Sequence, residues 1–131
     1  MSTPVTILES ETHTRLTMDD GKANALSFAM LDALGEGLEV AAAAGTPLVI
    51  AGRPGKFSAG FDLAVMAGGG DDMLRLLRQG SAMSERLLRF DTPVVLAVTG
   101  HALAMGALLC LSADYRLGVR GDFKIGLNEV A

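Results

Sequence analysis

Hydrophobic and polar positions alternate near the start of the chain, in the pattern of a β-strand with one buried face. In residues 3–9 the apolar positions include Val5 and Ile7, and in residues 12–18 they include Leu16. We therefore expect two strands here, followed by a polar turn with the sequence DDGKANALS.

The pattern then changes to helical spacing. Ser27 is a typical helix N-cap and Gly45 a typical stop, which predicts a helix from Ser27 to about Ala44. The segment at 47–52, PLVIAG, is short, apolar and β-branched, which indicates a buried strand. It leads into a loop over residues 51–63 with the sequence AGRPGKFSAGFDL.

The rest of the chain continues to alternate helix and strand. A second helix is expected after three glycines at 68–70, with Asp71 and Asp72 as its cap. The segment at 92–100, TPVVLAVTG, predicts another buried strand, and a helix is expected to begin near Met105. This alternation indicates an α/β domain. The second helix has its apolar positions at Met73, Leu76, Leu77, Met83, Leu87 and Leu88, and YRLGV at 115–119 predicts a further strand.

Composition narrows the class of protein. A chain of 131 residues forms one domain or part of one, and it can bury roughly two-thirds of its unfolded surface. The net charge of −4 argues against nucleic acid as a partner. The N-terminus lacks the pattern of a signal peptide, and no apolar stretch is long enough to cross a membrane. We expect a cytoplasmic protein.

Single residue types narrow the chemistry further. Cys110 is the only cysteine, so an internal disulfide and a cysteine metal cluster are excluded. It lies in an apolar run, which favours a buried inert thiol over a nucleophile. Four arginines of the second expected helix have two interpretations, a solvated face, which we favour, or a site for an anionic group. They are Arg75, Arg78, Arg86 and Arg89.

The loop at 51–63 combines glycines, a lysine and a serine, yet two familiar interpretations fail on spacing. A phosphate-binding P-loop would need a glycine where Ile50 stands, and a serine or threonine directly after the lysine. Phe57 separates Lys56 from Ser58. A nucleophile elbow would need a glycine two residues before the serine, where Lys56 stands. The function of the loop must therefore be inferred from the segments around it.

Two strand-to-helix junctions share one layout, in which a buried strand is followed by an irregular turn with small residues and then by the start of a helix. They are VIAGRPGKFSAGFDL and LAVTGHALAMGALL. A helix N-terminus presents unpaired N–H groups, and two such junctions side by side can direct backbone donors at one developing oxyanion. Gly60 and Gly106 carry no Cβ that would obstruct a ligand. The alternative is that these small residues only serve the packing of tight turns.

Four motifs in order carry a resemblance to a known family. GKFSAGFDL resembles the first signature of the crotonase superfamily, the enoyl-CoA hydratases and isomerases, and VTGHALAMGALLCLSADYRL resembles the second. KANALS and IGLNEV resemble two further elements of that family. The resemblance implies an α/β fold of the ClpP/crotonase type, a ββα superhelix, over residues 1–131. It covers roughly the N-terminal half of a usual member, so we expect a domain truncated at its C-terminus.

The same resemblance implies an oxyanion hole for a CoA thioester. Its two donors would be the backbone N–H groups of Phe61 and Met105. The family has three glycines around the second donor, whereas this chain has Ala104, Met105 and Gly106. The backbone donor survives this change, but the Met105 side chain must point away from the thioester.

A second departure concerns the carboxylates. Hydratases of the family use two glutamates, whose positions correspond here to Leu108 and Glu129. Leucine cannot transfer a proton, so Glu129 is left as a single acid/base. One carboxylate beside an oxyanion hole resembles the layout of the isomerases that shift a β,γ double bond to the α,β position. The alternatives are a hydratase or another crotonase reaction, and a CoA-thioester binder without catalysis.

The remaining site residues also follow from the resemblance. Arg53 and Lys56, together with Lys22, lie at turns where the family holds the CoA nucleotide, and phosphate contact or solvation are both open for them. Capping of a short helix is the favoured role of Asp62; His13 is expected at the surface and His101 without a catalytic role. The expected substrate and CoA contacts are Lys22, Ala23, Ser58, Ala59, Gly60, Asp62, Leu63 and Leu108.

The expected partner is an acyl-CoA thioester. No metal or separate cofactor is expected, because CoA is part of the substrate, and neither nucleic acid nor a membrane is expected as a partner. Family members usually form trimers or hexamers, so a homo-oligomer is expected for a full-length protein.

Overall fold

The computed structural model describes residues 3–127. Its largest sheet has the strand order β1 (Val5–Glu9), β2 (Thr14–Met18), β4 (Leu48–Ala51), β7 (Val94–Val98) and β9 (Tyr115–Gly118). The first pair is antiparallel and the others are parallel. β4 and β7 are apolar on both faces, as parallel strands covered on both sides are. The strands expected in 3–9, 12–18, 47–52, 92–100 and 115–119 are confirmed.

Two small sheets lie where the two junctions were expected to be irregular. One has the order β10 (Ile125–Gly126), β8 (Gly100–Leu103) and β5 (Gly55–Ser58), and the other pairs β3 (Ala25–Leu26) with β6 (Gly60–Phe61). All these pairs are parallel. The expectation of irregular turns was therefore wrong, because each short strand is stabilised by a partner from a distant part of the chain.

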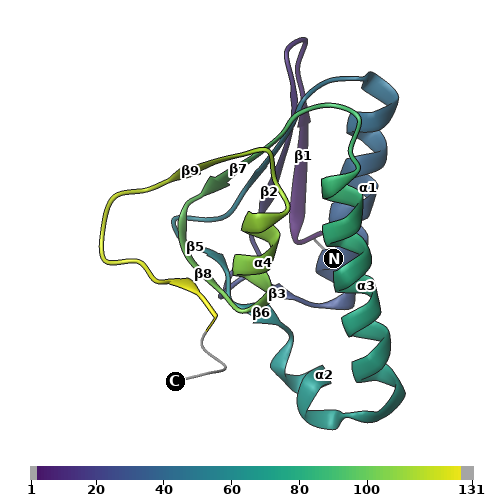
Figure 1. Ribbon diagram of the computed structural model, residues 1–131, viewed down its shortest axis with the longest axis vertical. Helices are drawn as coiled ribbons and strands as arrows, with labels where there is room; N and C mark the ends of the chain where they lie inside the picture. The colour runs from purple at the N-terminus through teal and green to yellow at the C-terminus, as the bar shows by residue number, and fades with distance from the viewer. Residues whose placement is uncertain (1–2, 128–131) are drawn as a thin grey trace.

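Two long helices lie side by side on one flank of the molecule (Figure 1). The expected helix is α1 (Phe28–Ala44), in which the Ser27 side chain accepts the Met30 N–H at 3.0 Å. Gly45 ends it in the left-handed conformation, at a φ of 68° that glycine adopts without strain. The other helix is α3 (Gly70–Leu88), which is joined to α1 by the Arg86–Glu39 pair at 2.6 Å.

The start of α3 differs from the expected cap. Gly69 is the N-cap residue and makes no side-chain cap hydrogen bond, while Asp71 and Asp72 lie inside the first turn. At this place their negative charges interact favourably with the positive end of the helix dipole, although they form no capping hydrogen bond. The glycines separate α3 from the short α2 (Leu63–Gly68), whose N-cap is Asp62.

The core is built mainly from aliphatic side chains and methionines, as the composition suggests. Leu16 reaches it from the sheet and Leu34 from α1, while Phe57 of β5 is its largest fully buried side chain. Among residues 3–127 no helix is long and apolar enough to cross a membrane. The same residues contain no cluster of three or more side chains suited to hold a metal ion.

Candidate functional site

The two junctions run side by side because β5 pairs with β8. Gly55 lies opposite Gly100 and Ser58 opposite Ala102, with an irregularity in register between Lys56 and Ser58. The backbones are so close that a Cβ on Gly100 would overlap the backbone of Gly55. Each junction then continues into a helix, α2 after the first and α4 (Met105–Leu111) after the second.

Gly60 is the point where the two junctions meet. A methyl group built on it would lie 3.0 Å from the Ala104 Cβ and 3.3 Å from the backbone nitrogen of Met105. Gly60 also has a φ of 98°, which side chains rarely adopt. Phe61 follows directly, so the structure brings the two expected backbone donors, Phe61 and Met105, into neighbouring positions.

Ala104 is held in a conformation that normally belongs to glycine. Its φ of 52° and ψ of −124° match the first central residue of a type II′ turn. The cost of such a position is about 1–3 kcal/mol, and strained residues of this kind concentrate at functional sites. Its N–H donates to the Gly126 carbonyl at 3.0 Å, and its own carbonyl accepts from Ala107 and Leu108. These bonds hold the start of α4 in place.

The Met105 side chain packs into the protein. The residue is buried, and its Cε lies 3.8 Å from the place where Gly80 of α3 would carry a Cβ. The half-buried Phe61 ring fills the space against the same glycine. As the first residue of α4, Met105 has an N–H without an acceptor within the helix. A methionine at this position therefore keeps its side chain on the core side.

A buried polar network supports the first junction, and the sequence had indicated no role for its central residue, Asn24. The Asn24 Nδ2 donates to the carbonyls of Met18 at 2.9 Å and Phe57 at 3.1 Å, and Oδ1 accepts the Asp20 N–H at 3.0 Å. Asn24 has a φ of 54°, which asparagine tolerates better than most residues. Ser58, expected as a substrate contact, is fully buried, and its hydroxyl donates to the Asn24 carbonyl at 2.8 Å.

Of the two positions that correspond to the glutamates of hydratases, the structure describes Leu108 but not the expected acid/base. Glu129 lies outside the described residues. Leu108 is 39% exposed and lies one turn after Met105, on the wall of a hollow of about 360 Å³ between α3 and α4. The hollow is lined by Ser81, Ser84, Leu88, Met105, Leu108, Leu111 and Ser112.

The basic residues at the turns have different surroundings. Arg53 donates to the Lys22 carbonyl at 2.6 Å and pairs with Asp19 at 3.2 Å, so its guanidinium is engaged within the protein. Lys22 and Lys56 are exposed. Arg53 bonds the backbone of both residues, that of Lys22 through its guanidinium and that of Lys56 through its own backbone. Of the other expected contacts, Ala59 and Leu63 are exposed, and Ala23 and Asp62 are half-buried.

The two histidines and the cysteine make hydrogen bonds or packing contacts within the protein. The His101 Nδ1 accepts the Lys124 N–H at 3.0 Å, and its ring packs edge-on against Phe123. His13 lies at the turn between β1 and β2, beside Thr12. Cys110 is buried, and this burial raises the pKa of its thiol, with a smaller opposing effect from Arg116. A thiol with a raised pKa is a poor nucleophile, which agrees with the expected inert role.

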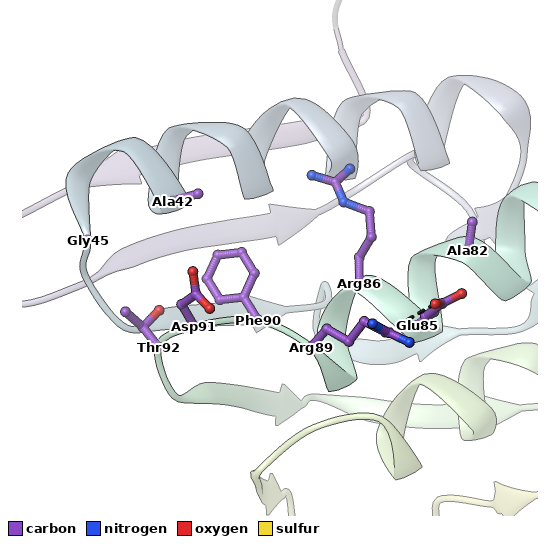
Figure 2. Close-up of a pocket in the computed structure, with 9 residues that line it drawn as sticks. All are labelled: Ala42, Gly45, Ala82, Glu85, Arg86, Arg89, Phe90, Asp91 and Thr92. Atoms are coloured by element: carbon purple, nitrogen blue, oxygen red, sulfur yellow. Dashed lines mark ion pairs between the residues drawn. The ribbon is translucent and has the colours of Figure 1, made fainter.

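A larger hollow, of about 520 Å³, lies away from the junctions, between the C-terminal ends of α1 and α3 (Figure 2). Two of the four arginines line it, but Arg86 pairs with Glu39 and Arg89 with Glu85 at 3.1 Å. These pairs favour the solvated face over an anion site. The lining residues are Ala42, Gly45, Ala82, Glu85, Arg86, Arg89, Phe90, Asp91 and Thr92.

The fold and the paired junctions define an α/β protein of crotonase type, and comparison with known proteins agrees. The family model for enoyl-CoA hydratase/isomerase matches residues 9–130. The chain therefore belongs to the enoyl-CoA hydratase/isomerase family.

Individual relatives give the same result. A family member from Pseudomonas syringae superposes with a TM-score of 0.94 at 40% identity, over 96% of this chain and 55% of that one. A probable enoyl-CoA hydratase of Bacillus subtilis is 32% identical over 119 residues, which are 88% of this chain and 46% of the relative. The chain thus spans about half the length of these relatives.

A third relative shows that names do not separate the two activities. A Mycobacterium tuberculosis protein, 41% identical with a TM-score of 0.84, covers 88% of this chain, which in turn spans 51% of it. It is called an enoyl-CoA isomerase in one structure and a probable enoyl-CoA hydratase in another.

Proposed function

We propose that this chain acts on acyl-CoA thioesters and shifts a β,γ double bond to the α,β position. The observation that carries the proposal is the meeting of the two junctions, where Gly60 lies against the Met105 backbone nitrogen. A carbonyl oxygen placed between the N–H groups of Phe61 and Met105 would receive two hydrogen bonds. Such a pair stabilises the negative charge that develops when a thioester enolises.

The reaction then needs one proton carrier. In the proposed sequence the Glu129 carboxylate removes a proton from the α-carbon, and the electron pair moves onto the thioester oxygen as an enolate. When the enolate collapses, the double bond forms between the α- and β-carbons, and Glu129 returns the proton to the γ-carbon. The substrate keeps its atoms and its oxidation state, so this scheme uses no cofactor beyond the CoA that the substrate carries.

Exchange of the α-proton tests this proposal directly. A saturated acyl-CoA incubated with the protein in deuterated water should exchange its α-protons, because enolisation needs only the hole and the base. Mass spectrometry measures the deuterium content. Binding without exchange would favour a CoA-thioester binder. Absence of both binding and exchange would contradict the proposal.

A hydratase is the second candidate, and the names of several relatives favour it. Leu108 is the residue that decides between the two. We expect Leu108→Glu to gain hydration of an α,β-enoyl-CoA by at least roughly tenfold, because it adds the second carboxylate that positions water. Loss of the absorbance of the conjugated enoyl thioester measures the gain.

Leu74→Glu is the matched control for Leu108→Glu. Leu74 of α3 is similarly exposed, at 46%, and the change adds the same charge at a place that lines no described hollow. It should leave hydration at the wild-type level. Efficient hydration by the wild-type chain itself would contradict the preference for isomerisation.

A further inference from the structure

The Ser58 hydroxyl joins two segments that lie far apart in the sequence. It donates to the Asn24 carbonyl at 2.8 Å and accepts the Gly60 N–H at 3.2 Å. Both partners are backbone groups, and the Ser58 side chain is fully buried. The hydroxyl therefore holds backbone in place and does not itself reach a bound substrate.

The Asn24 end of this bridge is a rigid anchor. The Asn24 side chain bonds the carbonyls of Met18 and Phe57, which belong to β2 and β5. A third bond, from the Asp20 N–H, closes the turn in front of it. Because these groups lie in or beside the core, the Asn24 carbonyl has a fixed position against which Ser58 is held.

The Gly60 end determines how the next peptide group is turned. Gly60 is held by Ser58 on one side of Phe61, and on the other side the Asp62 N–H donates to the Leu26 carbonyl at 3.1 Å. Successive N–H groups of an extended strand point to opposite edges. The Phe61 N–H is therefore directed away from the β3 edge, and its direction depends on both neighbouring bonds.

Ser58 also touches the second junction. A methyl group on Gly106 would lie 2.9 Å from the Ser58 Cβ, so the two residues are in tight contact. The same side chain thus fixes the Phe61 peptide through its hydroxyl and packs against the residue after Met105 through its Cβ.

We infer that Ser58 is a positioning residue of the site, whose hydroxyl aims the Phe61 N–H at the thioester oxygen. This inference rests on the function proposed above. It assigns to a buried side chain a role in the rate of enolisation without any contact with the substrate.

The polarisation of the bound carbonyl tests the inference. In the wild-type protein, the stretching band of a saturated acyl-CoA, isotope-labelled at the thioester carbonyl, should move to lower frequency on binding. Ser58→Ala should lose most of this movement and lower the rate constant of α-proton exchange by roughly 10–100-fold. The dissociation constant should stay within about threefold, because substrate contacts remain.

Two further variants make the result specific. Thr14→Val removes another fully buried hydroxyl, which lies away from the junctions and is hydrogen-bonded to the Thr46 hydroxyl at 2.9 Å. This variant should keep the wild-type shift of the carbonyl band and the wild-type exchange rate. Ser58→Cys keeps a weak donor and acceptor and should give intermediate values, which decides the matter if Ser58→Ala does not fold.

The outcomes separate this inference from the proposed function. If folded Ser58→Ala showed the full wild-type band shift and exchange rate, the positioning role alone would be overturned. Where Ser58→Ala does not fold, the same result in Ser58→Cys would overturn it. Absence of any shift or exchange in the wild-type protein would overturn the proposed function and this inference together.

Discussion

Replacement of Glu129 by glutamine is expected to lower α-proton exchange of a saturated acyl-CoA by roughly 10²–10⁴-fold. Glutamine has nearly the same size and shape but cannot accept a proton at neutral pH. In the proposed mechanism the carboxylate acts on the α-carbon and backbone groups hold the carbonyl, so binding of the thioester should change little. Mass spectrometry of the exchanged substrate measures the rate, and calorimetry measures the affinity.

Glu11→Gln is the control for this change in charge. Glu11 is an exposed residue between β1 and β2, and its replacement should leave exchange at the wild-type rate. Equal exchange by the Glu129→Gln variant and the wild-type protein would remove Glu129 from the mechanism. A parallel loss of affinity would instead show that the carboxylate supports binding, and the single-base scheme would then be wrong.

The elements that could be predicted from the sequence are those whose signals lie within the segment itself. The helix α1 is an example, since Ser27 bonds the Met30 N–H at one end and Gly45 turns left-handed at the other. The strands β4 and β7 are short apolar runs whose burial follows from composition. These local signals establish the α/β alternation without any knowledge of tertiary contacts.

The short strands of the junctions could not be predicted in this way. β5 has the sequence GKFS and β8 the sequence GHAL, and neither shows a strand pattern. They are strands because Gly55 meets Gly100, a residue 45 positions further along the chain. Such a pairing depends on the whole fold, so only the resemblance to a family indicated that the junctions form one site.

Within the site, the backbone positions were more predictable than the support beneath them. The motifs pointed to Phe61 and Met105, which the structure brings near each other. Asn24 lies within the recognised turn, but a polar residue in a turn is usually solvated, and its bonds to Met18 and Phe57 depend on tertiary packing. A buried amide with a positive φ becomes apparent only in three dimensions.

Asn24→Ala is accordingly expected to destabilise the protein by about 2–4 kcal/mol, the largest effect on stability that we predict. The change leaves carbonyls of Met18 and Phe57 and the Asp20 N–H without a partner on this side chain. Alanine is also strained at a φ of 54°. Urea unfolding measures the change, and an unaltered slope with denaturant would show that the unfolded state is the same.

Two companion variants divide that loss into its causes. Asn24→Gly removes the same hydrogen bonds but tolerates the positive φ, so it should be about 1 kcal/mol more stable than Asn24→Ala. Gln79→Ala removes an exposed hydrogen bond of 2.6 Å from the side-chain amide to the Asp32 carboxylate. It should lower the free energy of unfolding by less than about 0.5 kcal/mol. If Asn24→Ala cost as little as Gln79→Ala, the buried network would not stabilise the fold. Ser58 would then lack the fixed anchor that aims the Phe61 N–H.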